Sequence, residues 1–154
     1  MKDLLGYIPF RVAAGLFALL PERWMRWLGE RGGDLAYRND SGRHPMMRSH
    51  MRRILGDRAS DEEVEVAVQG MYRSYGRYWA ETFWFRPRKT SKILAAVERE
   101  NFGPVFASIE AGRPRIFMLP HIGNWEVAGL VAKEIGTPVT AVAEHLPNER
   151  ITNW

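Results

Sequence analysis

Two short apolar runs enclose a helical segment near the end of this 154-residue chain. The run from Arg115 to Leu119 stops at Pro120, and a second run covers Pro138 to Ala143. Both resemble buried strands, and the segment between them, from about Asn124 to Ile135, has a helical pattern. Because strand, helix and strand in this order form a parallel crossover unit, we expect an α/β fold here.

The sequence before residue 102 predicts helices. The clearest one opens at Ser60, whose side chain can cap exposed amides while Glu63 reaches back. It is expected to end before Pro87 and to bury one apolar stripe. That stripe consists of Val64, Ala67, Met71, Tyr75, Tyr78, Trp79 and Phe83.

Two shorter helices are expected at Met46 to Leu55 and at Gly103 to Ala111, the second ending at Gly112. Loops are expected at Gly32-Gly33 and at Asn39 to Gly42, where glycine and small polar residues gather. The chain contains no cysteine, which excludes disulfides, thiolate metal sites and cysteine nucleophiles.

The positive charge of the chain lies at its start. Residues 1 to 60 hold 11 basic and 6 acidic residues, although the whole chain carries only +4. Such a segment suits an anionic lipid surface or nucleic acid, but arginine content alone supports the latter and no nucleic-acid motif accompanies it. We therefore expect lipid contact and no nucleic acid.

Residues 1 to 30 are expected to be membrane-associating helices. The apolar run Leu4 to Leu20 is interrupted by Pro9 and Arg11, so it falls short of the roughly 20 apolar residues that span a bilayer. Trp24, Trp27 and Leu28 share a helical face that suits lipid headgroups. The alternative is that these side chains pack on the rest of the domain, and one helix can do both.

The candidate site follows the first predicted strand. Loops at the carboxyl ends of strands in open α/β sheets bind ligands, and His121 lies in such a loop. Gly123 permits close backbone approach, Asn124 can cap the next helix and Glu126 falls in its first turn.

This arrangement suits acyl transfer to a hydroxyl. An alcohol is a poor nucleophile, so we expect His121 to remove its proton as it attacks a thioester carbonyl. Glu126 would orient the imidazole and stabilise its charged form, while amides near Gly123 and Asn124 would face the oxyanion. His145 with His121 and Glu126 could form a metal site, but no short-spaced ligand pair supports one, so no metal is expected.

The segment Pro120-His-Ile-Gly-Asn-Trp-Glu126 resembles the HX4E signature of the bacterial lysophospholipid acyltransferase superfamily. The similar branch holds the lipid A lauroyl and myristoyl acyltransferases and the actinobacterial phosphatidylinositol mannoside acyltransferases. Ser74 to Phe83 and Ala143 to Pro147 resemble segments of the latter enzymes, although His50 stands where asparagine is more common and Phe83 to Pro87 is longer than usual.

The resemblance implies a glycerol-phosphate-acyltransferase-like α/β fold, with residues 31–154 as its N-terminal part. It also implies an acyl-CoA or acyl carrier protein donor, no cofactor, a glycolipid acceptor and peripheral attachment to the cytoplasmic face of the inner membrane. Glu144 is implied as a substrate-binding residue beside Gly123 and Asn124. Since the family is about twice as long, we expect a truncated domain whose 154 residues alone have little activity.

Overall fold

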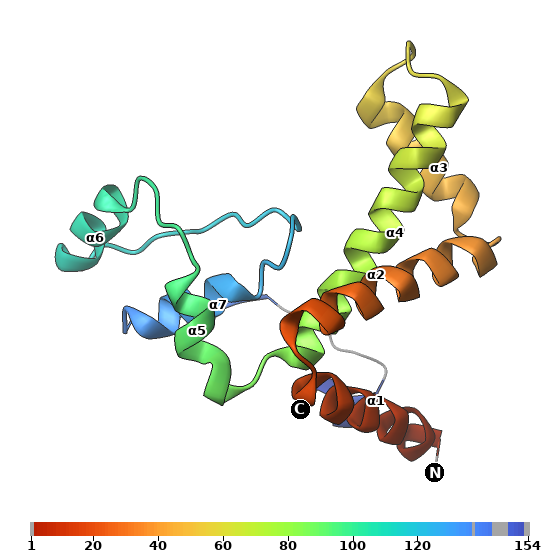
Figure 1. The fold of residues 1–154 in the computed structure, drawn as a ribbon. Coiled ribbons are helices and arrows are strands. Elements are labelled where there is room, and N and C mark those ends of the chain that lie inside the picture. Colours follow the sequence, from red (N-terminus) through yellow and green to blue (C-terminus); the bar gives the residue numbers. More distant parts are fainter. Residues whose placement is uncertain (1, 137, 143–147, 153–154) are drawn as a thin grey trace. The chain divides into compact units, whose positions relative to one another are not determined.

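A computed structural model describes residues 2–136, 138–142 and 148–152 (Figure 1). The chain divides into two compact units, which are described separately: a helical unit, Pro9–Trp84, and a motif unit, made of Met1–Ile8 and Phe85–Trp154. The helices are α1 (Lys2–Leu19), α2 (Glu22–Asn39), α3 (His44–Leu55), α4 (Asp61–Trp84), the 3-10 turn η1 (Pro87–Lys89), α5 (Thr90–Ala95), α6 (Gly103–Glu110), α7 (Val127–Glu134) and α8 (Glu149–Thr152).

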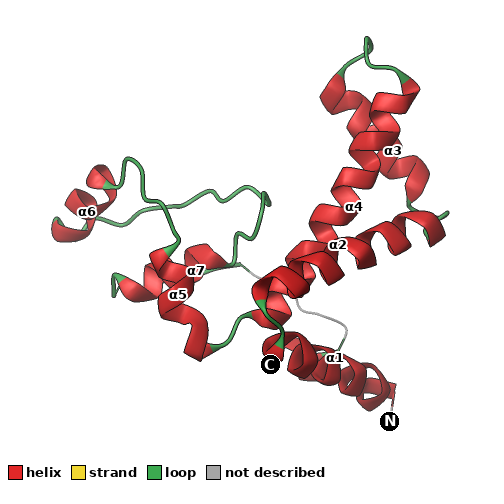
Figure 2. Ribbon diagram, viewed as in Figure 1, coloured by secondary structure: helices red, strands yellow, loops and turns green. Residues whose placement is uncertain are grey.

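The predicted α/β fold is wrong for the part of the chain that the structure describes, which forms helices and loops without a β-strand (Figure 2). Residues 115–119 and 138–142 are irregular, and residue 143 lies outside the described residues. A strand is held by hydrogen bonds to a neighbouring strand, and a buried strand also needs a covering layer. The first run has no such layer here, because Ile116 and Met118 are 93% and 91% exposed.

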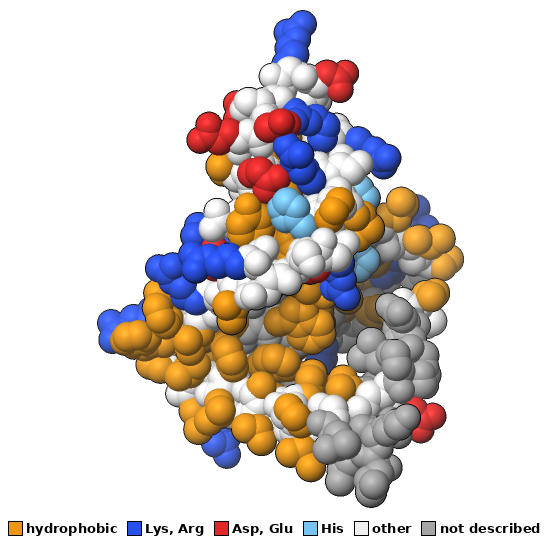
Figure 3. All heavy atoms as spheres, turned by 90° about the vertical axis from the view of Figure 1, so that its right-hand side faces the viewer, with side chains coloured by type: hydrophobic (Ala, Val, Ile, Leu, Met, Phe, Trp, Pro, Cys, Tyr) orange, Lys and Arg blue, Asp and Glu red, His pale blue; other side chains and the backbone are white. Residues whose placement is uncertain are grey.

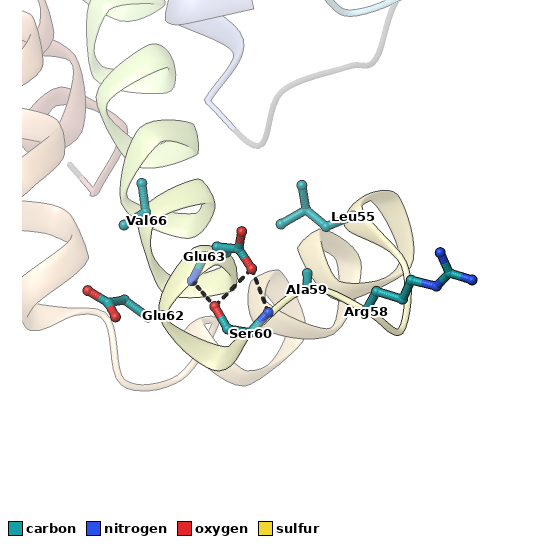
Figure 4. A pocket seen from close by; sticks show the side chains of 7 residues that line it. All are labelled: Leu55, Arg58, Ala59, Ser60, Glu62, Glu63 and Val66. Atoms are coloured by element: carbon teal, nitrogen blue, oxygen red, sulfur yellow. Dashed lines mark hydrogen bonds between the residues drawn. The ribbon is translucent and has the colours of Figure 1, made fainter.

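The predicted helices are confirmed, with small shifts at their ends. The Ser60 hydroxyl accepts a hydrogen bond from the Glu63 amide at 3.2 Å, and the Glu63 carboxylate accepts one from the Ser60 amide at 2.7 Å (Figure 4). This reciprocal cap fixes the start of α4. In the motif unit, α6 ends at Glu110, shortly before Gly112. The φ of Gly112 is +62°, the left-handed conformation that commonly ends a helix.

The loop expected at Gly32-Gly33 is replaced by continuous helix, because glycine here serves the crossing of α2 and α4 (Figure 1). A Cβ added at Gly33 would lie 2.3 Å from the carbonyl oxygen of Tyr72. One added at Gly76 would lie 2.2 Å from the carbonyl oxygen of Gly29. The two helices therefore touch backbone to backbone, an approach that a larger residue would prevent.

The buried stripe of α4 is offset from the predicted one. Tyr75 and Trp79, expected in the core, are 55% and 36% exposed. Helix α2 packs closely on α4 at Gly76. The α4 side chains spaced four residues apart on either side of that glycine are therefore the ones that are buried. The buried residues of α4 are Val64, Val68, Tyr72, Ala80 and Trp84.

A buried carboxylate also joins α2 to α4. Asp34 is 6% exposed, and the Arg73 guanidinium donates to its two oxygens at 2.6 and 3.1 Å. Gln69 donates to it as well, at 2.8 Å. These donors, Arg73 foremost, lower the pKa of Asp34 from 3.8 to about 2. The charged form of Asp34 is thus favoured by folding.

We expect the contribution of Asp34 to stability to depend on pH in a defined window. Because its folded pKa is depressed, the contribution is complete above pH 3.8 and disappears as the pH falls towards about 2. The difference in free energy of unfolding between the wild type and Asp34→Asn, measured by urea denaturation, should therefore shrink over that range. Asp57→Asn, which changes an exposed acid, is the control. A wild-type advantage that stays constant from pH 5 to pH 2 would contradict this assignment.

Candidate active site

The predicted catalytic residues lie in the motif unit, on the irregular segment that joins α6 to α7. His121 is exposed there, at the centre of a tight turn in which the Ile122 amide donates to the Pro120 carbonyl at 2.8 Å. Glu126 is the N-cap residue of α7. The predicted helix thus begins at Val127, slightly later than expected, and Glu126 stands at its boundary.

Gly123 turns the backbone between the two predicted catalytic residues. Its φ of +62° is a conformation that other residues rarely adopt. A Cβ at this position would meet nothing within 4 Å. The requirement for glycine is therefore conformational, and the open space leaves the backbone accessible to a ligand. Asn124 follows, half-buried, and its carbonyl accepts the Val127 amide at 3.2 Å.

The His121 ring packs against Trp125, four residues further along. The two ring centroids are 4.9 Å apart and the planes cross at 88°, an edge-to-face arrangement. The sequence analysis did not predict this contact. The sequence signal that could have indicated the contact is the aromatic residue four positions after the histidine.

His121 and Glu126 lie five residues apart on one short segment, which by itself does not establish contact between their side chains. Their pairing as base and orienting acid therefore stays a prediction. Catalytic hydrogen bonds are often long or absent without substrate and tighten when it binds. Glu144, the other predicted substrate-binding residue, and His145 lie outside the described residues.

A surface pocket occurs elsewhere, in the helical unit at the turn from α3 to α4 (Figure 4). None of the predicted site residues lines it. Its polar centre is the Ser60–Glu63 pair that caps α4, so a structural role accounts for these side chains. The lining residues are Leu55, Arg58, Ala59, Ser60, Glu62, Glu63 and Val66.

Comparison with known proteins identifies the chain's relatives. The model of the bacterial lipid A biosynthesis acyltransferase family matches residues 5–154. The chain belongs to this family. The family resemblance expected from the HX4E segment is therefore confirmed, and both His121 and Glu126 lie inside the matched residues of this acyltransferase-family chain.

Two relatives carry a more specific name. A phosphatidylinositol mannoside acyltransferase of Mycolicibacterium smegmatis is 29% identical over 149 residues, which cover 96% of this acyltransferase-family chain and 46% of the relative. A protein of the same name from Mycobacterium tuberculosis is 30% identical over 143 residues, covering 90% and 44%. The chain thus spans less than half the length of these relatives. No solved structure matches it significantly.

Proposed function

We propose that this acyltransferase-family chain carries the general base of an enzyme that moves a fatty acyl chain from a thioester to a sugar hydroxyl of a membrane glycolipid. The observation that carries the proposal is the family match across residues 5–154 with His121 and Glu126 inside it. The relatives' name, phosphatidylinositol mannoside acyltransferase, supports phosphatidylinositol mannoside as the acceptor.

The proposed reaction begins when the His121 imidazole takes the proton of the acceptor hydroxyl. The hydroxyl oxygen then forms a bond to the thioester carbonyl carbon, and the carbonyl oxygen becomes an oxyanion. Backbone amides of the Gly123–Asn124 turn would donate to that oxyanion. Collapse breaks the carbon–sulfur bond, and the imidazolium returns its proton to the departing thiolate.

Glu126 would approach the other ring nitrogen of His121 once substrate is bound. A carboxylate in that position fixes the tautomer and stabilises the imidazolium. Trp125 would restrict the ring from one side through its edge-to-face contact. The cycle needs no metal and no covalent acyl-enzyme, and its donor is acyl-CoA or an acyl carrier protein.

Two alternatives have support of their own. The family's description favours a lipid A-type acceptor, and the half-exposed tryptophans of α2 favour a membrane-binding module without activity. Labelled acyl-CoA, offered with phosphatidylinositol mannoside or a lipid A precursor to the complete polypeptide that the gene encodes, separates them. Label in phosphatidylinositol mannoside supports the proposal, and label only in the lipid A precursor supports the first alternative. Transfer to neither acceptor, with vesicle binding intact, supports the second.

Attachment to the cytoplasmic face of the inner membrane is part of the proposal. Within the helical unit, α1 exposes Val12, Leu16 and Leu19, the last at 83%. Figure 3 shows apolar side chains exposed over much of the lower half of the face that it draws. In α2, Trp24 and Trp27 are half-exposed, and the Arg31 guanidinium lies 5.7 Å from the centre of a Trp27 ring. Indole and guanidinium together favour the headgroup region.

Among the described helices, none is both long and apolar enough to cross a bilayer.

We expect the double substitution Trp24→Ala with Trp27→Ala to weaken vesicle binding about tenfold, because two half-exposed indoles would no longer enter the interface. Co-sedimentation with phosphatidylglycerol vesicles measures the change, and phosphatidylcholine vesicles report the part due to lipid charge. Tyr75→Ala is a matched control, since it removes an exposed aromatic ring from α4. Equal binding by wild type and double variant would place membrane contact elsewhere.

A further inference from the structure

An aromatic face lies on the surface of α4, within the helical unit. It consists of three rings that the sequence predicted for the core: Tyr75, Tyr78 and Trp79. Tyr75 and Trp79 are exposed, and Tyr78 is half-buried. The rings of Tyr75 and Trp79 lie edge to face with centroids 6.1 Å apart, and Tyr78 stacks on Tyr75 at the same distance, tilted by 14°. The proposed acyl-transfer chemistry uses none of the three.

The aromatic face has uncharged neighbours. Residues three or four positions apart share one side of a helix, and those beside the three rings are Met71 and Thr82. The cations of this part of α4, Arg73 and Arg77, pair instead with acidic residues of α2, at 2.6 and 3.8 Å. The aromatic face therefore favours a ligand without charge.

The exposed rings are polar at their edges. Tyr75 has a phenol hydroxyl and Trp79 an indole N–H, so each combines an apolar face with a hydrogen-bonding group. A sugar ring has the matching construction, because its C–H groups form apolar faces and its hydroxyls form a polar rim. It can cover an aromatic ring while its hydroxyls bond to the polar edge. An acyl chain would cover the same rings but offer their polar groups no partner.

The aromatic face is joined to the helix that is proposed to contact the membrane. Trp79 packs on Phe83 with ring centroids 5.8 Å apart, and Phe83 packs on Phe10 of α1 at 5.0 Å. The exposed residues Val12 and Leu16 lie on the other side of α1. Since a helix is about 10 Å across, the aromatic face lies roughly that far from the proposed lipid contact. The sugars of a glycolipid, which project from the bilayer surface, reach this level.

We propose that the aromatic face of α4 binds a sugar ring of a membrane glycolipid. The ring stacks on Tyr75 and Trp79, and its hydroxyls bond to their polar edges. The site rests on the proposed function and deepens it, because it names the residues of this chain that hold the sugar of the acceptor. A different occupant, such as another part of the complete polypeptide, gives a different result in the experiment below.

Co-sedimentation of the complete polypeptide with two kinds of vesicle tests the site. One kind is phosphatidylglycerol alone, and the other has part of it replaced by phosphatidylinositol mannoside, so that the charge is equal and the headgroup sugars differ. The wild type should bind the mannoside vesicles about tenfold more tightly. Tyr75→Leu with Trp79→Leu should bind both kinds equally. Tyr75→Phe with Trp79→Phe should keep most of the preference, because it retains the rings.

Trp24→Ala with Trp27→Ala is the matched control. It removes two half-exposed rings from the proposed membrane contact, so it should weaken binding to both kinds of vesicle by the same factor and keep the preference. Because leucine and phenylalanine are similar in size and apolarity, a loss confined to the leucine variant reports the rings and not the packing beneath them.

Absence of a preference in the wild type, or a preference that the leucine variant keeps, would overturn the proposal. If that variant keeps the preference but unfolds at a lower urea concentration, the aromatic face packs against another part of the polypeptide instead. Binding is measured without turnover and can be repeated in His121→Ala. Failure here therefore leaves the acyl-transfer proposal, which label transfer tests, standing.

Discussion

His121→Ala is expected to lower the rate of acyl transfer about 10³-fold or more in the complete polypeptide. Without the imidazole, no group in the turn can take the hydroxyl proton as the thioester is attacked, and a well-placed general base contributes up to about 10⁴-fold. Vesicle binding should be unchanged, because His121 lies in the motif unit, whereas Trp24 and Trp27, the proposed membrane contacts, lie in the helical unit. Transfer of label from acyl-CoA, measured under single-turnover conditions, reports the chemical step.

Two further variants test the roles within the turn. Glu126→Gln keeps the size of the side chain but removes its charge, so it should slow transfer about 10²-fold or more and alter the pH dependence of the rate. His50→Ala removes an exposed histidine from α3 and should leave the rate within twofold. Retained turnover in His121→Ala would exclude this residue as the base. A normal rate and pH profile in Glu126→Gln would show that Glu126 does not orient it.

Gly76→Ala is expected to destabilise the helical unit by about 3 kcal/mol, the upper end of the usual cost of overpacking. The added Cβ would lie 2.2 Å from the Gly29 carbonyl oxygen and 2.8 Å from the Gly33 nitrogen. Both neighbours are backbone of α2, so neither can move aside by changing rotamer. Urea denaturation followed by helical circular dichroism measures the loss.

The same helix provides a control for Gly76→Ala. A Cβ at Gly70 meets nothing within 4 Å, so Gly70→Ala should stabilise the unit by up to about 1 kcal/mol through helix propensity alone. Gly33→Ala and Gly32→Ala form a second pair on α2, the first crowded and the second open. Similar effects of the crowded and open members would show that the helices do not cross at these glycines.

Helix positions were predictable because their signals are local. The Ser60–Glu63 cap and Gly112 mark ends through interactions within a few residues, and the structure contains both. The loop predicted at Gly32-Gly33 was wrong because glycine occurs both in turns and in close helix crossings. Only a packing partner distant in sequence distinguishes the two. That partner is Gly76, and the same crossing moved the buried stripe of α4 away from Tyr75.

Strands were not predictable in the same way. An apolar run indicates burial, but a strand forms only where a neighbour supplies hydrogen bonds and a covering layer, both of which are non-local. The run through Ile116 and Met118 is irregular and exposed. For the site, the sequence predicted His121 in a loop and Glu126 at the start of the next helix, but it could not determine that the His121 ring would contact Trp125.

The order of the helices along the helical unit has a consequence for how this chain folds during translation. Helix α4 packs against α2 and α3, the two helices that precede it, so every partner in this packing has been synthesised once residue 84 is added. Domains begin to fold as translation proceeds from the N-terminus. Residues 9–84 can therefore assemble on the ribosome before the histidine-bearing turn has been translated.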